Sequence, residues 1–315
     1  MVDRDRIQSL SEEGQNSRFF DELEQEVTPC AEDLGMSDRL TVSANLERLW
    51  LPIALNIVMS RNKLDRTLIQ GILGGQGTGK STLCSILQQV LNYLGFSVAT
   101  LSIDDLYLTY AERQVLRKED PRLIWRGPPG THDVALGLEI IEQCLQENSS
   151  TQILLPRFDK SAFDGEGDRT EPKKIAQPNI LLFEGWFVGV QPLAKFPDQF
   201  PLPIATAEDI QFAKDNNKRL QAYLPLWDKL DSLIVLYPED YRLSQQWRQE
   251  AEQRMIATGK TGMSDTECDR FVEYFWQALH PELFIKPLLA TADLVVEITS
   301  DRVSTILVKE TIEKN

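Results

Sequence analysis

The sequence predicts an α/β fold in which a parallel sheet carries helices on both faces. Segments with the apolar, β-branched composition of buried strands alternate with segments of helical periodicity along most of the chain. One strand-like segment, residues 68–73, runs directly into a glycine-rich loop. The loop is followed by apolar residues at helical spacing, with Gly95 placed to end the helix: Leu83, Ile86, Leu87, Val90, Leu91 and Leu94.

The glycine-rich loop has the pattern G-x-x-x-x-G-K-S, which is typical of phosphate-binding loops. Its glycines allow successive backbone N–H groups to point at one anion, at the positive end of the following helix. Lys80 would reach the β- and γ-phosphates, and the Ser81 hydroxyl would contact a bound Mg²⁺. A glycine-rich surface turn is the alternative, but the strand–loop–helix order favours nucleotide binding. The predicted ATP-binding residues here are Gly74, Gly75, Gln76, Gly77, Thr78, Gly79, Lys80, Ser81 and Thr82.

Composition excludes several classes of protein. With 315 residues, 42% hydrophobic and 26% charged, the chain has the composition of a globular protein with a full core. A formal net charge of −15 argues against a nucleic-acid partner, although local basic residues can still bind a small anion. No apolar run approaches the ~20 residues of a membrane span, and the N-terminus resembles neither a signal nor a transit peptide, so we expect a cytoplasmic protein with no membrane partner. The four cysteines form no C-x-x-C pair, which indicates reduced structural thiols.

The chain divides into a lead-in and one large domain. Residues 1–44 are polar and acidic, and we expect loosely held helical segments there. Residues 45–315 form the predicted domain, which begins with an amphipathic helix over 46–58. The segment Asn62–Asp65 matches the guanine-reading N-K-x-D motif of GTPases, but it precedes the phosphate loop instead of following it, so we interpret it as coincidence.

Acidic residues follow two further strand segments. The strand 96–103 delivers Asp104 and Asp105, and the strand 179–183 ends in Glu184. Ligands of open parallel sheets bind outside the carboxyl ends of the strands, so these carboxylates are placed for chemistry. Glu184 has the Walker B arrangement that holds Mg²⁺. A helix-capping or turn role is the alternative for the Asp pair, and for Asp105 the two interpretations are evenly balanced.

Two charged loops supply candidate substrate-binding residues. The first covers 126–133 and leads into a helix that ends near 146; the second covers 157–169 and is dense in charge and glycine. Alternating basic and acidic residues suit a polar, anionic small molecule, whereas a solvated loop is the alternative. The predicted substrate-binding residues are Asp105, Tyr107, Arg126, His132, Asp133, Arg157, Asp159, Lys160 and Arg169.

The last third of the chain predicts an insertion and a lid. Residues 191–226 begin proline-rich and become a polar helix, as an insertion over the site or the edge of the sheet would. After the strand 232–237, a basic helix and loop over about 240–262 carry Arg248, a predicted catalytic residue, and Arg254, a predicted ATP-binding residue. A lid of this kind would close on phosphates and exclude water. The alternative is an ordinary surface helix whose arginines pair with Glu250 and Glu252. The aromatic-rich helix 264–279 and the strand 293–298 complete the predicted fold.

These elements together predict phosphoryl transfer to a small hydroxyl compound. In that reaction a protein mainly positions its substrates and stabilises charge. Asp104 would accept the proton of the acceptor hydroxyl as its oxygen attacks the γ-phosphorus, with Lys80 as the second catalytic group of the core. A nucleotide-hydrolysing switch protein is the rival, but it would carry N-K-x-D downstream of the loop.

Several blocks of the sequence resemble a known family. Residues 74–82 together with 102–107 are similar to the P-loop kinase group that contains uridine kinase, phosphoribulokinase and pantothenate kinase. The blocks 126–133, 155–161 and 183–189, in this order, resemble the D-glycerate 3-kinase family. The resemblance covers about residues 45–300.

The resemblance implies a P-loop kinase-type fold and the ATP-dependent phosphorylation of D-glycerate at its primary hydroxyl, which closes photorespiration. It implies ATP and Mg²⁺ as cofactors, Asp104 as the base and Glu184, with Ser81, at the metal. Glycerate is a carboxylate, and arginine is suited to its bidentate capture, but the sequence leaves open which basic residue binds it. A kinase of another small hydroxyl metabolite, similar to uridine, pantothenate or a ribulose phosphate, remains the alternative. Oligomeric state is not predicted.

Overall fold

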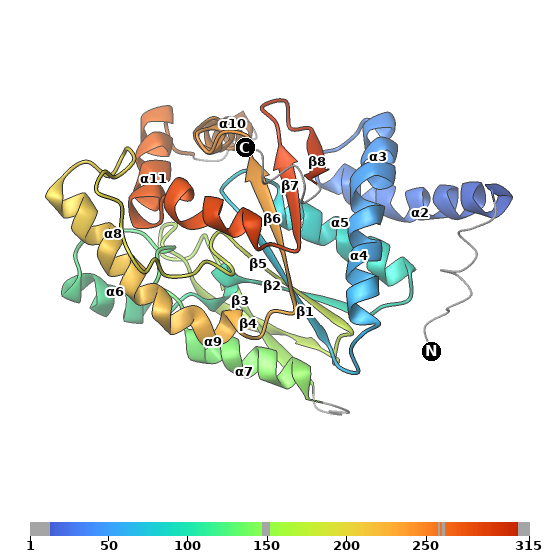
Figure 1. Cartoon of the computed structure of the whole chain (residues 1–315), viewed down its shortest axis with the longest axis horizontal. Coiled ribbons are helices and arrows are strands. Elements are labelled where there is room, and N and C mark those ends of the chain that lie inside the picture. Colours follow the sequence, from blue (N-terminus) through green and yellow to red (C-terminus); the bar gives the residue numbers. More distant parts are fainter. Residues whose placement is uncertain (1–12, 147–151, 258, 260–261, 308–315) are drawn as a thin grey trace.

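A six-stranded sheet forms the centre of the molecule. The computed structural model describes residues 13–146, 152–257, 259 and 262–307. The strand order is β2-β5-β1-β6-β7-β8 (Figure 1). The first five strands are parallel, as predicted, whereas the edge strand β8 is antiparallel to β7 and was not predicted. The strand bounds are β1 Leu68–Gly74, β2 Val98–Ser102, β5 Ile180–Gly185, β6 Ser232–Pro238, β7 Leu294–Ile298 and β8 Ser304–Leu307.

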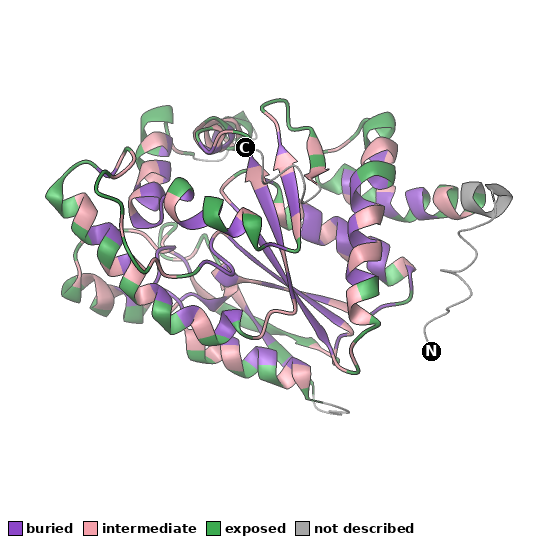
Figure 2. Cartoon of the chain, in the orientation of Figure 1, coloured by how far each residue is buried: buried purple, intermediate pink, exposed green. Residues whose placement is uncertain are grey.

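Helices cover both faces of this sheet, so its central strands are buried on both sides (Figure 2). Alternate strand residues point to opposite layers: Ile72 and Leu182 join one core, and Leu73 and Phe183 join the other. The first core is completed by α2 (Glu13–Asp33), α3 (Arg39–Asn45), η2 (Leu46–Trp50), α4 (Leu51–Arg61) and α5 (Lys80–Tyr93). The second is completed by α7 (Val134–Leu145), η4 (Gln221–Tyr223), α9 (Leu224–Trp227), η5 (Pro281–Ile285) and η6 (Lys286–Ala290).

The expectation of a loosely held lead-in is wrong for the described part of residues 1–44. Helix α2 buries Leu23, Val27 and Ala31 completely in the first core. The buried positions are spaced four residues apart, so one narrow apolar stripe packs the helix although its overall composition is polar. Residues 1–12 lie outside the described part of the chain.

A second sheet of two strands replaces the predicted loop at 157–169. Strand β3 (Ile153–Asp159) pairs antiparallel with β4 (Asp168–Ile175), and residues 160–167 form the tip of this hairpin. The tip has four residues with positive φ, Phe163, Asp164, Gly165 and Gly167, and guanidinium groups of the neighbouring segment hold it. Arg113 donates to the carbonyls of Glu166 (2.7 Å) and Gly167 (2.6 Å). The glycines and charges that suggested a loop belong to a fixed hairpin tip.

The remaining helices are η3 (Ile103–Leu106), α6 (Tyr110–Glu119), α8 (Ala207–Leu220), α10 (Leu243–Ala257) and α11 (Asp265–Ala278). The last three agree with the predicted helices, whereas η3 begins at Ile103, a residue that the sequence assigned to the strand. Helix α8, inside the predicted insertion, packs against α11 through Phe212 and Tyr274. Three residues of the predicted lid, 258, 260 and 261, are not described. Over the described ranges, no helix is both long enough and apolar enough to span a membrane.

Candidate active site

The phosphate loop joins the end of β1 to the start of α5. Gly77 and Gly79 have φ values of +75° and +82°, and a Cβ on Gly77 would lie 2.6 Å from Cβ of Trp247. Glycine is therefore required at Gly77 by both the backbone conformation and the packing. The Lys80 ammonium donates to the carbonyl of Gly75 (2.9 Å). The loop has the conformation in which backbone N–H groups at a helix N-terminus bind an anion.

Ser81 and Glu184 meet beside this loop. Because β1 and β5 are adjacent parallel strands, with Leu73 opposite Gly185, their carboxyl ends lie together. The Ser81 hydroxyl donates to Oε1 of Glu184 (3.1 Å), and the Glu184 side chain is buried. Burial lowers the pKa of Lys80, while the carboxylates of Glu184 and Asp104 oppose that shift. Lys80, Glu184 and Asp104 thus form one electrostatic cluster.

The oxygen pair of Ser81 and Glu184 fits a Mg²⁺ ion that also binds phosphate. Mg²⁺ usually takes one or two protein oxygens and completes its octahedron with phosphate oxygens and water. In the described part of the chain, no group of three or more His, Cys, Asp or Glu side chains could hold a metal by itself. The donor set therefore suits an ion that arrives with a nucleotide.

Asp104 lies at the carboxyl end of β2, next to Glu184 on β5. Its Oδ1 accepts a hydrogen bond from the Tyr107 hydroxyl (2.8 Å), and its Oδ2 accepts one from the Lys160 ammonium (2.6 Å). Burial alone would raise the pKa of Asp104, but the Lys160 charge and these two hydrogen bonds outweigh burial and hold the pKa below its usual value. Asp104 is therefore an ionised carboxylate whose two oxygens are both bound.

Asp105 has a structural position, in agreement with the capping alternative. Its Oδ2 accepts from the backbone N–H of Ser102 (3.1 Å) and completes a capping box at the start of η3. The same oxygen accepts from Arg157 (2.9 Å). Burial raises the pKa of Asp105, and Arg157 opposes the shift. The two adjacent acids therefore have different environments. Asp104 faces the cluster at the phosphate loop, whereas Asp105 accepts from the backbone N–H of Ser102 and from Arg157 of the hairpin.

The predicted substrate-binding cations differ in what they already bind. Arg157 pairs with Asp105 and Arg169 with Asp133, each at 2.9 Å. Arg126 donates to the carbonyls of Gly165 (2.6 Å) and Glu166 (2.9 Å), and its guanidinium lies over the ring of Tyr107 at 5.9 Å. No carboxylate of the described residues pairs with Arg126. Asp159 is exposed, and its carboxylate accepts from the amide and the hydroxyl of Ser161 at the start of the tip.

His132 lies buried between Tyr107 and Phe187. Its ring stacks on that of Tyr107 at 4.6 Å, and its Nδ1 is 2.8 Å from the Tyr223 hydroxyl. The Tyr223 oxygen also accepts from the N–H of Gly130 (2.8 Å). Burial lowers the pKa of His132 to about 3, so the ring is neutral. Tyr223 was not among the predicted site residues. In the sequence it is one of several aromatic residues of the predicted insertion, and no motif marks it.

The arginines of α10 pair with acids of the same helix. Arg248 pairs with Glu252 and stacks over Phe271 (5.1 Å), and Arg254 lies 4.0 Å from Glu250. The structure thus shows the pairing of the surface-helix alternative, and a lid role for Arg248 and Arg254 stays a prediction. The arginine that does reach the phosphate loop, Arg302 on the β7–β8 turn, was missed. It donates to the carbonyl of Gly77 (3.4 Å) and lies over the Trp247 ring.

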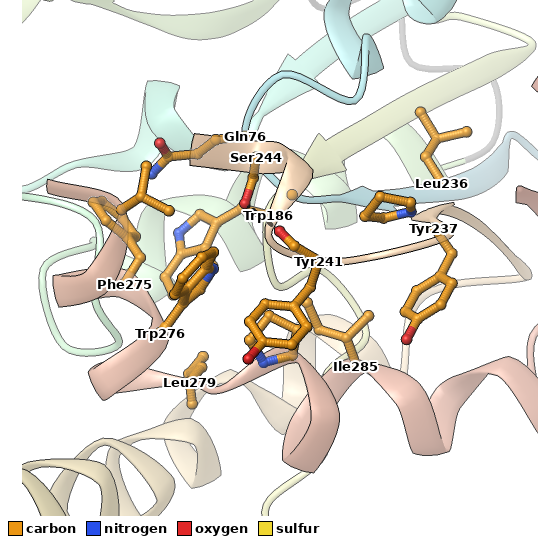
Figure 3. A pocket seen from close by; sticks show the side chains of 14 residues that line it. Gln76, Trp186, Leu236, Tyr237, Tyr241, Ser244, Phe275, Trp276, Leu279 and Ile285 are labelled. Carbon is orange, nitrogen blue, oxygen red and sulfur yellow. Dashed lines mark hydrogen bonds between the residues drawn. The ribbon is translucent and has the colours of Figure 1, made fainter. Parts of the chain in front are cut away.

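An almost entirely apolar pocket adjoins the other side of the phosphate loop. Gln76, Trp186, Tyr241, Phe275 and Trp276 are among its lining residues, and Figure 3 shows the aromatic side chains from α11 and the strand ends gathered around it. Such a lining does not suit a small anion, because burying an unpaired carboxylate there would be costly. A polar acceptor is better matched by the cluster around Asp104, Lys160 and Arg126.

The chain is similar to known proteins in both sequence and structure. No family model matches the sequence. The chain is 34% identical over 247 residues to the chloroplastic D-glycerate 3-kinase of Arabidopsis thaliana, a match that spans 74% of this chain and 52%, about half, of that relative. It is 35% identical over 223 residues to the uncharacterized kinase mug58 of Schizosaccharomyces pombe, covering 67% of this chain and 79% of the relative. A solved D-glycerate 3-kinase from Cryptococcus neoformans superimposes with a TM-score of 0.69 and 25% identity, over 81% of this chain and 97% of that one.

Proposed function

This chain belongs to the D-glycerate 3-kinase family of ATP-dependent P-loop kinases, and we propose that it phosphorylates D-glycerate at the primary hydroxyl. The products are 3-phosphoglycerate and ADP. The observation that carries the proposal is the position of Asp104, an ionised carboxylate in the same cluster as Lys80 and Glu184 at the phosphate loop. A base beside a triphosphate site supports transfer to a hydroxyl.

The geometry supports a proposed role for each of these residues. The acceptor hydroxyl donates a hydrogen bond to Asp104, which takes the proton as the oxygen–phosphorus bond forms. The bond between the γ-phosphorus and the bridging oxygen breaks, and its electron pair leaves with ADP. The Lys80 ammonium lies at the phosphate loop, where it donates to the carbonyl of Gly75. From this position it would balance the negative charge of the transferring group. Ser81 and Glu184 would hold Mg²⁺, which neutralises phosphate charge when bound.

Arg126 is the proposed partner of the acceptor carboxylate. Arg157 and Arg169 are each neutralised by an acid of the body, whereas Arg126 bonds two carbonyls and keeps a net charge facing Tyr107. We expect Arg126→Met to raise KM for D-glycerate by ~10–100-fold, because a charge-assisted hydrogen bond contributes about 1.5–3 kcal/mol, and to leave KM for ATP within about twofold. Steady-state kinetics with each substrate varied in turn would measure both.

Arg117→Met is the matched control for Arg126→Met. Arg117 also holds the hairpin tip, but through the carboxylate of Glu166 (3.0 Å). Arg117→Met should therefore show how much a loosened tip alone changes the KM for D-glycerate, because Arg126 is still present to bind the acceptor carboxylate. An equal rise of the D-glycerate KM in both variants would assign Arg126 a structural role only.

The proposal is tested by ADP release with Mg·ATP and a panel of acceptors. The panel contains D-glycerate, L-glycerate, uridine, pantothenate, ribulose 5-phosphate and a sample without acceptor. ADP formed with D-glycerate alone, with the product identified as the 3-phosphate, is the expected result. Turnover with another acceptor would support the alternative kinase, and hydrolysis independent of any acceptor would support a nucleotide switch. The photorespiratory role, the cytoplasmic location and the absence of a nucleic-acid partner remain predictions.

A further inference from the structure

Among the described residues, four ion pairs join the β3–β4 hairpin to the rest of the protein. In three of them the hairpin supplies the cation, whereas in the fourth Glu166 of the tip pairs with Arg117. Arg157 pairs with Asp105, Lys160 with Asp104 and Arg169 with Asp133. The Lys160 side chain is 62% exposed, whereas those of Arg157 and Arg169 are 27% and 28% exposed. Of these three paired cations, Lys160 therefore has the most freedom to change its partner.

The Lys160 contact weakens the base that the reaction needs. Proton transfer to a carboxylate is most effective when its pKa lies near the working pH. Lys160 and Tyr107 together hold the pKa of Asp104 below the ordinary value, so Asp104 is a poor proton acceptor while both contacts persist. Removing the ammonium would raise that pKa, because a nearby positive charge favours the ionised carboxylate.

Acceptor binding brings a second carboxylate close to Asp104. D-Glycerate has only three carbons, so its carboxylate must lie near Asp104 when the primary hydroxyl is bonded to that residue. Two carboxylates this close repel unless a cation lies between them. The other groups facing Asp104 cannot supply that cation. Lys80 is committed to the phosphate loop, His132 is neutral, and Tyr107 carries no positive charge. Arg126, the proposed partner of the acceptor carboxylate, lies across the Tyr107 ring and bonds carbonyls of the hairpin tip instead of Asp104.

Resting on the function proposed above, we propose that Lys160 exchanges Asp104 for the carboxylate of the incoming acceptor, so that acceptor binding itself frees the base. Lys160 is then a positioning residue with two states. In the empty site it covers Asp104, and water, which has no carboxylate, does not draw it away. With D-glycerate bound, its ammonium pairs with the acceptor carboxylate beside Asp104, and Oδ2 of Asp104 is left to accept the hydroxyl proton. The exchange thereby protects ATP from hydrolysis when no acceptor is present.

The test compares Lys160→Met with the wild type in three assays. The first measures ATP hydrolysis without acceptor, which should rise several-fold because the base stays uncovered. The second measures KM for D-glycerate, which should rise ~10–100-fold, while KM for ATP stays within about twofold. The third uses glycerol, an uncharged acceptor with the same terminal diol. The ratio of kcat/KM for D-glycerate to that for glycerol should fall by ~10–100-fold, since only the charged acceptor loses a partner.

Two further variants control for changes in the hairpin. Lys174→Met removes an exposed lysine from β4 of the same hairpin and should match the wild type in all three assays. Lys160→Arg retains the charge and should restore most of the discrimination between D-glycerate and glycerol. Wild-type turnover of D-glycerate with unchanged hydrolysis and unchanged discrimination in Lys160→Met would overturn the exchange alone. No turnover of D-glycerate by the wild type would overturn the proposed function, and the exchange with it.

Discussion

Replacing Lys80 by methionine is expected to reduce kcat by about 10³-fold while leaving the fold intact. The ammonium interacts with the carboxylates of Glu184 and Asp104 and touches the loop carbonyl of Gly75, so it is placed where charge develops during phosphoryl transfer. Removing a positioned electrostatic partner of this kind typically costs ~10²–10³-fold, and more where it bears on transferring phosphate. ADP release at saturating ATP and D-glycerate would measure the loss.

The same substitution should not destabilise the protein. Burial lowers the pKa of Lys80, which means that the charged form is held in the folded state at a cost in free energy. Methionine keeps the aliphatic stem and removes that cost, so we expect the melting temperature to stay at or above that of the wild type. Lys63→Met, at an exposed position before β1, is the matched control and should retain full activity. Wild-type-like turnover of Lys80→Met would contradict the assignment of the phosphate loop.

Replacing Asp104 by asparagine is expected to lower kcat by ~10²–10⁴-fold, with nucleotide binding retained. Asparagine preserves size and hydrogen bonding to Tyr107 but accepts no proton in the transition state. Asp105→Asn should instead lower the free energy of unfolding by about 1 kcal/mol, since it weakens the capping of η3 and the pair with Arg157, and should affect kcat less. Single-turnover kinetics and thermal unfolding of both variants separate the two roles. A greater loss of kcat in Asp105→Asn would reverse the assignment of the base.

The electrostatics of Asp104 also predict the pH dependence of the wild type. A carboxylate is an active base above its pKa, and that of Asp104 lies below its usual value. His132, with a pKa of about 3, stays neutral over the same range. Neither group should therefore produce an acid limb in kcat/KM for D-glycerate between pH 8 and about pH 5. An inflection near pH 6 that is lost in a His132→Gln variant would show that His132 titrates there.

The phosphate loop, Glu184 and Asp104 could be predicted because each depends on a short stretch of sequence at the end of a strand. A buried strand followed by glycines and a helix fixes the backbone locally, and parallel pairing then brings the strand ends together. Residues 157–169 were mistaken for a loop because the charges and glycines of the segment mark the tip of a hairpin. The two strands of this hairpin pair with each other, and Arg113 and Arg126 bond the carbonyls of its tip. The packing of α2 was also missed, because its composition is mostly polar. Three fully buried apolar residues, Leu23, Val27 and Ala31, nevertheless pack the helix against the first core.

The alternation of strands and helices, the anion site at Gly74–Ser81 and the acids beside it could all be read from the order of the residues. These features follow from local backbone preference and from periodicity, which are properties of neighbouring residues. Three-dimensional packing was needed to tell which of the two adjacent acids faces the phosphate loop, which arginines already pair with an acid, and which cation covers Asp104. Those outcomes depend on contacts between residues far apart in the chain, such as Lys160 with Asp104 and Tyr223 with His132. The sequence shows which side chains carry charge or can form hydrogen bonds. Which groups they contact depends on how distant segments of the chain pack together.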